Sequence, residues 1–230
     1  MPLSTFENLN KERQKEILDT CLEEFALHDY RDVSLTRIIK KLGLAKGSFY
    51  RYFSSKKELY AYLIEYGKRA TYELFKDIFF RSVEDVLDSW VNFYLACAEQ
   101  DNAHPLIGYF GYKVSRERNN PILNDVPLTS KKKGMEVLRD MFKEQQEKGK
   151  LRKDVDVELL IFILIQVQEG FIDYLALKYD IDFEENIRGK KPLFPLSREV
   201  LKKELEAFVT VLREGFSAGE HGSVKGEKNA

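Results

Sequence analysis

The stretch SLTRIIKKLGLAKGSFYRYF, Ser34 to Phe53, decides the fold of this chain because it predicts two short helices separated by a turn. Ser34 is a suitable N-cap, since its hydroxyl can accept a hydrogen bond from a free amide of the first turn. The helix that follows has apolar residues at helical spacing: Leu35, Ile38, Ile39 and Leu42. Gly43 comes next, and glycine readily takes the left-handed conformation that ends a helix. A second helix, Ala45 to Arg51 with Phe49 inward, completes a predicted helix-turn-helix.

The distribution of charge favours a polyanion as the partner of this stretch. Residues 31–57 contain eight Lys and Arg residues and one acid, Asp32, for a net charge of +7, whereas the whole chain carries −1. A basic patch on an otherwise acidic protein is typical of nucleic-acid binding, because each phosphate contact releases condensed counterions. The alternative is a solvated helix face, which is the usual position of scattered lysines.

Further residues extend the pattern on both sides of the motif. They are Ile17-Leu18, Phe25-Ala26, Tyr30, Ile38, Leu42-Gly43-Leu44, Lys46-Gly47-Ser48-Phe49-Tyr50, Tyr52-Phe53 and Lys56-Lys57-Glu58-Leu59. Together they resemble the DNA-binding domain of the tetracycline-repressor (TetR) family. Beyond residue 59 the resemblance is only general, as in that family, whose C-terminal domains diverge with their ligands.

The chain departs from the family pattern at four positions of this domain. Glycine is usual where Asp29 stands, alanine where Ile39 and Leu42 stand, and serine where Ala45 stands. We expect the larger side chains of Ile39 and Leu42 to repack the two helices slightly. Ala45 removes a capping hydroxyl from the second helix.

The resemblance implies which side chains contact DNA. Those near base edges would be Lys46, Gly47 and Ser48, and those near phosphates would be Ser34, Thr36, Tyr50 and Lys56. Base specificity is expected from Arg37, Lys46 and DNA shape, because the second helix has only Arg51 among the residue types that read bases bidentately. For Tyr50 the alternative is a ring packed in the core, where we also expect Phe49 and Phe53.

Helical periodicity continues along the rest of the chain and predicts an all-α protein. Asn8 or Asn10 caps a first helix, and Ser55 to Glu58 is a capping box that begins the helix after the motif. The later helices are expected at 56–81, 83–100 with Ser82 as cap, 106–118, 127–149, 157–179 with Asp156 as cap, and 198–216 with Ser197 as cap. Residues 180–195 are expected to be a long connection. Helix 157–179 is so apolar that we expect it to be buried on several faces.

These elements suggest three segments. We expect a helix-turn-helix DNA-binding domain at 1–55, a larger helical domain for effector binding and dimerisation at 56–217, and a disordered tail at 218–230.

Aromatic and polar residues of the middle helices are candidates for a small-molecule site, because the resembling family encloses an effector cavity between such helices. The candidates are Tyr66, Trp90, Phe93, Tyr94, Phe110, Tyr112, Met135, Phe162 and Gln166. For each residue alone, ordinary core packing is the stronger interpretation. Gln166, Glu169 and Asp173 form a polar stripe on helix 157–179, and its partner can be a ligand, a dimer mate, a lysine of the final helix or solvent.

Several function classes find no support. The sequence contains no P-loop, nucleophile elbow or dinucleotide fingerprint, so we expect no catalysis and no cofactor. The three histidines lack the spacing of a metal site, and Cys21 and Cys97 lie in apolar helical patterns typical of buried thiols. The longest strongly apolar run, Leu159 to Val167, covers about half a membrane span, and no leader opens the chain. We expect a cytoplasmic protein with no membrane segment.

Together these features predict a homodimeric, ligand-responsive transcriptional regulator, a repressor in our interpretation, that binds a palindromic DNA operator. Helices 157–179 and 198–216 are expected to form the dimer. An apolar or amphipathic effector near Tyr66 and Ala70 would tilt helix 56–81 and spoil docking on DNA. The alternative is an architectural or nucleoid-occlusion protein with the same DNA-binding domain and no effector, and an all-α enzyme comes third.

Overall fold

The computed structural model describes residues 4–79, 85–116 and 126–216, and its secondary-structure elements are all α-helices. The expected all-α fold is therefore confirmed. The helices are α1 (Ser4–Glu7), α2 (Lys11–Leu27), α3 (Leu35–Lys41), α4 (Lys46–Tyr50), α5 (Lys56–Phe79), α6 (Val86–Ala103), α7 (Pro105–Arg116), α8 (Val126–Glu147), α9 (Val157–Tyr179), α10 (Phe183–Arg188) and α11 (Arg198–Phe216). The proposed tail at 218–230 lies outside the described residues.

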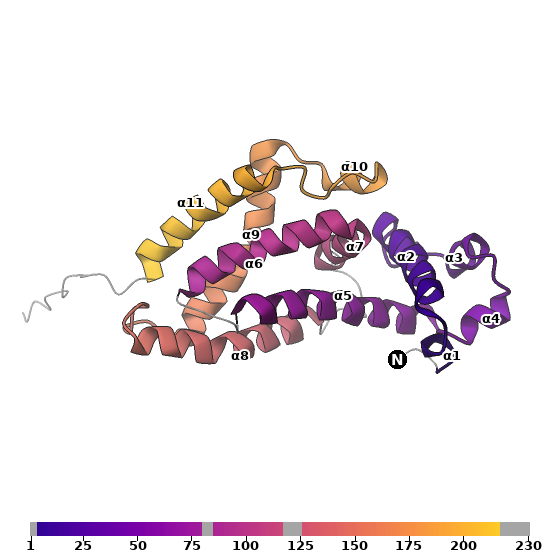
Figure 1. Cartoon of the computed structure of the whole chain (residues 1–230), viewed down its shortest axis with the longest axis horizontal. Helices are drawn as coiled ribbons and strands as arrows, with labels where there is room; N and C mark the ends of the chain where they lie inside the picture. The colour runs from indigo at the N-terminus through magenta and orange to yellow at the C-terminus, as the bar shows by residue number, and fades with distance from the viewer. Residues whose placement is uncertain (1–3, 80–84, 117–125, 217–230) are drawn as a thin grey trace, which may run out of the picture.

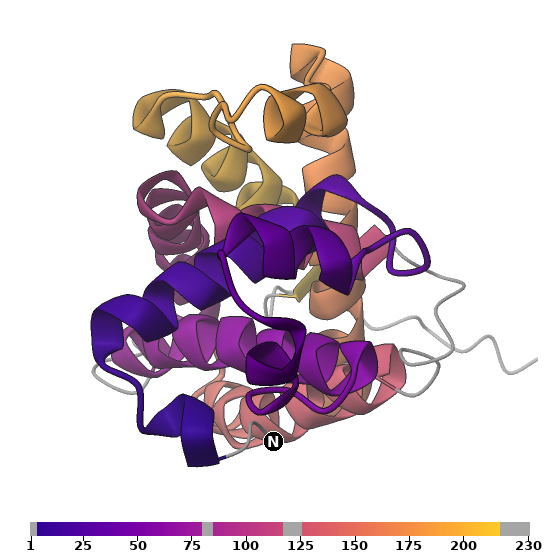
Figure 2. The same ribbon diagram turned by 90° about the vertical axis from the view of Figure 1, so that its right-hand side faces the viewer.

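The molecule is elongated, with α5 as a rod along its length (Figure 1). Helices α1 to α4 gather at one end of this rod and are called the head here; Figure 2 views the molecule from that end. α6 packs along α5, α7 packs on α2, and α11 packs on α6. α9 packs on α8 and crosses the direction of α5 steeply (Figure 1).

Aromatic side chains fill the core of the head. Phe49 and Phe53, which follow the motif turn, are fully buried with ring centroids 6.1 Å apart. Phe25 of α2 lies 5.1 Å from the ring of Tyr60, and Phe110 of α7 lies 5.6 Å from it. This core therefore includes side chains from α5 and α7, beyond the segment proposed as the DNA-binding domain.

A second core lies between α6, α8, α9 and α11. Trp90 of α6 and Phe171 of α9 are buried there, with ring centroids 6.2 Å apart. The far half of α5 packs against this core through Leu74, Phe75 and Ile78. Since Leu59 and Leu63 of the same helix are fully buried in the head, α5 joins both cores.

Most helix ends are where local capping signals place them. Asn10 accepts a hydrogen bond from the Arg13 amide at 2.8 Å, and Asp156 accepts one from the Glu158 amide at 2.9 Å. Ser197 accepts one from the Val200 amide at 3.3 Å, and Gly43 has the expected positive φ of 63°. These ends are predictable because the interacting groups are within four residues of one another.

Helix α6 begins later than expected. Its N-cap is Asp85, whose carboxylate accepts hydrogen bonds from Leu87 N at 2.8 Å and Asp88 N at 3.2 Å. The expected cap, Ser82, lies outside the described residues. Arg213 of α11 lies 2.5 Å from the Asp85 carboxylate, so a residue distant in sequence supports the cap. Burial would raise the pKa of Asp85, but Arg213 and the two amides hold it below its usual value.

The connection between α9 and α11 is more ordered than expected. It contains the short helix α10, capped by Asp182, with Phe183 and Ile187 buried. The helix within this long connection was not expected, because these two apolar side chains pack against Ala26 of α2, a contact that no local pattern reveals.

Three smaller features also differ. The short helix α1, which buries Phe6, was not expected. Helix α6 continues to Ala103 and α7 begins at Pro105, so the gap expected between helices 83–100 and 106–118 is reduced to His104. In the capping box, Ser55 accepts from Glu58 N at 3.1 Å as predicted, but the Glu58 carboxylate accepts from the amide of Ser54 at 2.7 Å.

Helix α9 is not buried on all faces within one chain. Leu159, Phe162 and Leu177 are exposed, and Leu177 retains 87% of its surface. Their apolar surface is therefore available to a partner. By length and composition alone, α9 could cross a membrane, a test that the core helices of globular proteins also pass.

Glu204 of α11 is the acid that links the last helices. It is buried, and Lys178 of α9 donates to both carboxylate oxygens at 2.7 and 2.8 Å. The hydroxyls of Tyr174 and Tyr179 donate to it at 2.8 and 2.7 Å. Lys178 and the two tyrosine hydroxyls lower the pKa of Glu204 to about 2.

We predict that Glu204→Gln flattens the pH dependence of stability in acid. Because the folded pKa is about 2 against an ordinary 4.5, this group contributes stability above pH 4.5 that is lost as the pH falls toward 2. Urea unfolding between pH 7 and pH 3 should show a smaller decrease for Glu204→Gln than for the natural chain. Glu206→Gln, an exposed acid on the same helix, is the control. An equal slope for all three proteins would contradict this role.

Candidate nucleic-acid interface

The helix-turn-helix is built by short-range bonds over a buried apolar layer. Ile38 and Ile39 of α3 and Phe49 of α4 are buried. In the turn, Gly43 N donates to Lys40 O at 3.2 Å, and Leu44 N donates to Ile39 O at 3.1 Å. The larger residues at positions 39 and 42 are accommodated inside the head, where both are buried.

The departure at position 29 causes no backbone strain. Asp29 is not among the residues with positive φ in the described part of the chain. Its carbonyl accepts hydrogen bonds from the amides of Asp32 at 2.8 Å and Val33 at 3.1 Å, which close the loop between α2 and α3. A glycine is therefore not needed at this position.

Helix α4 presents small and basic residues to solvent. Lys46 and Gly47 are exposed, and Tyr50 is 37% exposed. A Cβ added at Gly47 would meet no atom of the described residues within 4 Å, so no contact among them requires a glycine there. The preceding Ala45 caps the helix without a side-chain hydrogen bond, as its loss of a hydroxyl implies.

The Lys and Arg side chains of residues 31–57 divide into two groups. Within the described residues, five exposed side chains make no ion pair: Arg31, Lys40, Lys46, Arg51 and Lys57. In contrast, Lys41 pairs with Glu23, and Arg37 pairs with Glu24 at 2.6 Å. Phosphate contacts are thus best supplied by the first group.

Lys56 is used inside the protein. Its ammonium donates to the carbonyl oxygens of Tyr30 at 2.8 Å, Arg31 at 3.2 Å and Val33 at 3.1 Å. It also lies 4.8 Å from the centroid of the Tyr30 ring. An ammonium group has three protons, so these carbonyls can take all of them. Lys56 therefore fastens the loop before α3 to the start of α5.

Arg37 is similarly engaged. Its guanidinium donates to Glu24 at 2.9 Å and to the carbonyl of Asp32 at 2.7 Å. The Ser34 amide donates to the same Glu24 carboxylate at 2.9 Å, and the Ser34 hydroxyl caps α3 by accepting from Arg37 N at 3.3 Å. Burial would raise the pKa of Glu24, but these partners hold it below its usual value. To contact the edge of a base, Arg37 would have to break its hydrogen bonds with Glu24.

The remaining candidates of the head lie close to α4. Thr36 is exposed on α3, and Ser48 is half-buried on α4. Both are polar and small, so they can approach a groove beside Lys46 and Gly47.

The candidates for a small-molecule site do not share one location. Trp90, Phe93, Tyr94 and Met135 belong to the core between α6, α8, α9 and α11. Tyr66 and Phe110 belong to the core of the head, and the Tyr112 ring lies tilted against that of Phe183 with centroids 4.7 Å apart. Phe162 and Gln166 are exposed on α9.

One residue of the polar stripe of α9, Asp173, has a partner other than those first considered. Asp173 pairs with Arg116 of α7. The ion pair between α9 and the final helix is formed outside this stripe, by Lys178 of α9 and Glu204 of α11. Nothing is described for the side chain of Glu169.

Gln168 is a polar residue of the core around Trp90 that the sequence analysis missed. Trp90 Nε1 lies 3.4 Å from its side-chain oxygen, and the Tyr94 hydroxyl donates to its carbonyl at 2.9 Å. Counting from the buried Leu164, Gln168 and Phe171 occupy the same helical face at i+4 and i+7. That spacing is the signal that could have identified it.

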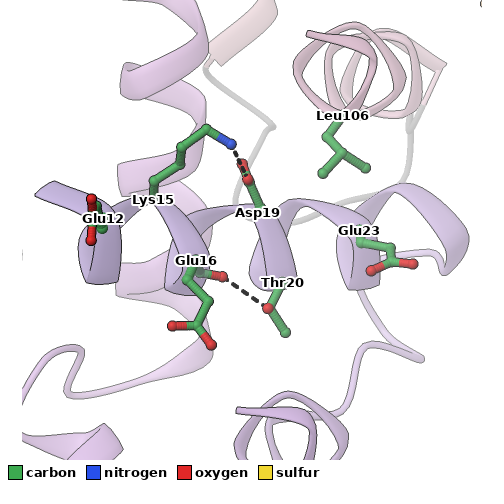
Figure 3. Close-up of a pocket in the computed structure, with 7 residues that line it drawn as sticks. All are labelled: Glu12, Lys15, Glu16, Asp19, Thr20, Glu23 and Leu106. Carbon is green, nitrogen blue, oxygen red and sulfur yellow. Dashed lines mark hydrogen bonds and ion pairs between the residues drawn. The ribbon is translucent and has the colours of Figure 1, made fainter.

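Two surface pockets lie away from α4. One, of about 400 Å³ (Figure 3), is lined by Glu12, Lys15, Glu16, Asp19, Thr20, Glu23 and Leu106. Its acidic rim would repel phosphate. The other, of about 410 Å³, is lined by Tyr112, Arg116, Asp173, Ala176, Asp180, Ile181, Asp182, Phe183 and Glu184. Tyr112 is the one predicted ligand residue that reaches either of these two pockets.

No metal site is evident among the described residues, where no three His, Cys, Asp or Glu side chains are placed to hold an ion. Both cysteines are free, and burial raises the pKa of Cys97 to about 12. Its thiol therefore remains protonated at neutral pH.

Comparison with known proteins identifies the same segment of the chain. Residues 17–63 match the profile of bacterial regulatory proteins of the tetR family. The helix-turn-helix regulator YdgC of Bacillus subtilis (strain 168) is 25% identical over 171 residues, which cover 72% of this chain and 80% of that protein. The transcriptional repressor AcnR of Corynebacterium jeikeium (strain K411) is also 25% identical over 171 residues, 72% of this chain and 82% of that protein.

A solved structure extends the likeness over nearly the whole chain. A TetR family transcriptional regulator from Chloroflexus aurantiacus J-10-FL superposes with a TM-score of 0.70 and 25% identity, and covers 94% of this chain and 99% of that one. The likeness therefore includes the helices that follow the head.

We predict that Lys56 and Lys46 differ in what they support. Lys56→Met should destabilise the protein by about 2 kcal/mol or more, because three hydrogen bonds from a charged donor are lost. Lys46→Met should leave unfolding unchanged but weaken binding to a random DNA duplex and reduce the salt slope by about 0.9. Denaturant unfolding and fluorescence anisotropy at several salt concentrations measure both. If Lys56→Met unfolded like the natural chain and reduced the salt slope as Lys46→Met does, Lys56 would be a DNA contact.

Proposed function

Because the chain belongs to the TetR family of transcriptional regulators, we propose that it represses transcription from a palindromic DNA operator as a homodimer and is released by a small apolar or amphipathic effector. The family is one of regulators and not of enzymes, and DNA is its target. The assignment of repression is supported by AcnR, a relative that is itself named a transcriptional repressor. We infer that the protein acts in the cytoplasm, where bacterial DNA is located.

The observation that carries the proposal is the exposed amino end of α4. Lys46 and Gly47 project into solvent, and the missing Cβ of Gly47 leaves space that the protein itself does not fill. A DNA backbone or base edge can use that space. Arg31, Lys40, Arg51 and Lys57, which make no ion pair in the part of the chain that the structure describes, supply charge for neighbouring phosphates. Ser34, Thr36, Ser48 and Tyr50 complete the proposed contact set, while Arg37 and Lys56 hold the loop beside it.

The exposed apolar residues of α9 and α11 support a homodimer. Leu159, Phe162 and Leu177 on α9 and Val211 on α11 are each at least 46% exposed. Large apolar side chains gathered on two helices are typical of a protein interface. A second copy of the chain would cover them by packing its own α9 and α11 in a four-helix bundle. Two-fold pairing then presents two α4 helices and requires a palindromic operator.

The core around Trp90 is the proposed position of the effector. Trp90 and Tyr94 lie 4.7 Å apart, and Gln168 places amide groups within this aromatic surrounding. Such a mixture suits an apolar molecule with one polar group. Met135 and Phe93 border the same core, and a ligand that separates α6 from α9 would also move the far half of α5. We place Tyr66, Phe110, Tyr112, Phe162 and Gln166 outside this effector site.

The alternative function, a DNA-binding protein without an effector, has one observation in its favour. The rings of Trp90, Phe171 and Phe208 lie with centroids 4.9 to 6.2 Å apart, so they already occupy this part of the core. A panel of apolar and amphipathic compounds distinguishes the two functions. Release of the protein from its operator supports the first, and no release with any compound supports the second.

We predict that Gly47→Ala weakens DNA binding without destabilising the protein. No atom lies within 4 Å of the new Cβ, and alanine favours a helix by up to ~1 kcal/mol over glycine. Affinity for an operator selected from random duplexes should decrease roughly tenfold, about 1.4 kcal/mol, because the methyl group occupies the space proposed for DNA. Gly111→Ala, an exposed helical glycine on α7 with the same free space, is the matched control. Unchanged operator affinity for Gly47→Ala would contradict the position proposed for α4.

We predict that Leu177→Asp converts a dimer into a monomer. Leu177 is 87% exposed in the single chain, so the substitution costs little within it, but a buried unpaired carboxylate opposes association by several kcal/mol. Sedimentation at micromolar concentration should show a dimer for the natural chain and a monomer for the variant. Tyr72→Asp, at an exposed residue of α5, should remain dimeric. A monomeric natural chain, or a dimeric Leu177→Asp, would refute this interface.

A further inference from the structure

The loop between α2 and α3 is held by cations from three other parts of the chain. Lys113 of α7 lies 3.1 Å from the Asp29 carboxylate. Lys56 at the start of α5 donates to the carbonyls of Tyr30, Arg31 and Val33, and Arg37 of α3 donates to that of Asp32. Since Ser34 follows this loop directly and caps α3, the position of the loop sets the position of the helix-turn-helix.

Lys113 connects this loop to α10. Its ammonium lies 2.9 Å from the Glu184 carboxylate as well as 3.1 Å from that of Asp29, and its side chain is only 17% exposed. Burial would lower the pKa of Lys113, but the hydrogen bonds and charges of Glu184 and Asp29 raise it above its usual value. Lys113 is therefore charged and bridges two elements that are more than 150 residues apart in the sequence.

A second contact joins α10 to the head. Phe183 and Ile187 pack in one buried cluster with Ala26 of α2 and Tyr109 of α7. Lys190, just after α10, lies 3.0 Å from Glu23 of α2. The connection between α9 and α11 thus reaches the head through one apolar contact, the Lys190–Glu23 ion pair and the Lys113 bridge.

We propose that α10 and Lys113 couple the position of the helix-turn-helix to helices α9 and α11, with Lys113 as a positioning residue that does not touch DNA. The inference rests on the dimeric operator binding proposed above. When α9 and α11 pair with a second copy, α10 is held at both of its ends. Its contacts with α2 and Lys113 then fix the loop before α3 in each subunit. This route adds to the contacts that α5 makes with the loop through Lys56 and through Tyr60, whose ring lies 4.9 Å from that of Tyr30.

The coupling affects specific binding more than non-specific binding. Two heads must match two half-sites about one helical turn apart, so a loosely held head spends less time in the matching position. Non-specific binding depends mainly on phosphate neutralisation and tolerates many positions of the head. Loss of the Lys113 bridge should therefore reduce the preference for an operator over random DNA.

The bridge can be removed without leaving a buried unpaired charge. In Lys113→Met the aliphatic part of the side chain remains, and the side chains of Asp29 and Glu184 are already 67% and 41% exposed. Asp29→Lys, Lys113→Glu and Glu184→Lys combined restore both ion pairs with inverted charge. Lys148→Met removes an exposed ion pair on the chain just after α8, with Glu144 at 2.5 Å, and is the matched control.

The experiment measures operator affinity, random-duplex affinity and hydrogen exchange at the amides of Asp32 and Val33, which are bonded to Asp29 O. Lys113→Met should weaken operator binding roughly 5- to 30-fold, leave random-duplex binding within about twofold, and speed exchange at both amides. The inverted triple variant is two charges more positive than the natural chain, which strengthens binding to any duplex, so its ratio of operator to random-duplex affinity and its exchange rates are compared: both should return to within about threefold of the natural chain, and Lys148→Met should change neither.

Three results would overturn the coupling: unchanged operator affinity and exchange in Lys113→Met, equal losses for operator and random DNA, or a triple variant as impaired as Lys113→Met. Failure of the proposed function looks different, because the natural chain itself would then be monomeric or prefer no selected duplex. Exchange at Asp32 and Val33 needs no DNA, so it decides the bridge in that case too. Faster exchange in Lys113→Met supports the bridge, and unchanged exchange refutes it.

Discussion

The burial of α5 in two cores is the constraint on which the rest of the structure depends. Leu59 and Leu63 are fully buried among the aromatic rings of the head, and Leu74 and Ile78 pack against the core around Trp90. Because one continuous helix supplies both sets of side chains, the head cannot rotate freely about a linker. Any displacement of α6 or α9 that moves the far half of α5 also acts on the head.

Positive charge has two separate tasks in the head. Lys56 and Arg37 donate hydrogen bonds to carbonyl and carboxylate oxygens of the protein, whereas Lys46 and Arg51 have no ion pair among the described residues. Net charge alone does not distinguish these tasks, because both groups add to the same +7 segment. The distinction is physical: a lysine whose three protons meet carbonyl groups gains little from a phosphate and would lose its bonds in reaching one.

The helices that follow the head combine an aromatic core with an exposed apolar face. Trp90, Phe171 and Phe208 pack against one another inside, while Leu177 and Val211 are exposed to solvent in the single chain. The buried Glu204, bonded to Lys178 and two tyrosines, fixes the angle between α9 and α11 beside that face. α10 connects this pair of helices to the head by packing on α2. A continuous set of contacts therefore joins the proposed dimer interface to the proposed DNA contact.

The sequence by itself determined whatever depends on neighbours along the chain. The helix-turn-helix, the caps at Ser34 and Asp156 and the left-handed Gly43 all arise from groups within a few residues, so periodicity and residue type predicted them. Only the tertiary structure decided which lysines are free, that Gln168 rather than Gln166 meets Trp90, and that α10 packs on α2. Those outcomes depend on contacts between residues up to about 160 positions apart. Such contacts form only when the chain folds, so no local sequence pattern contains them.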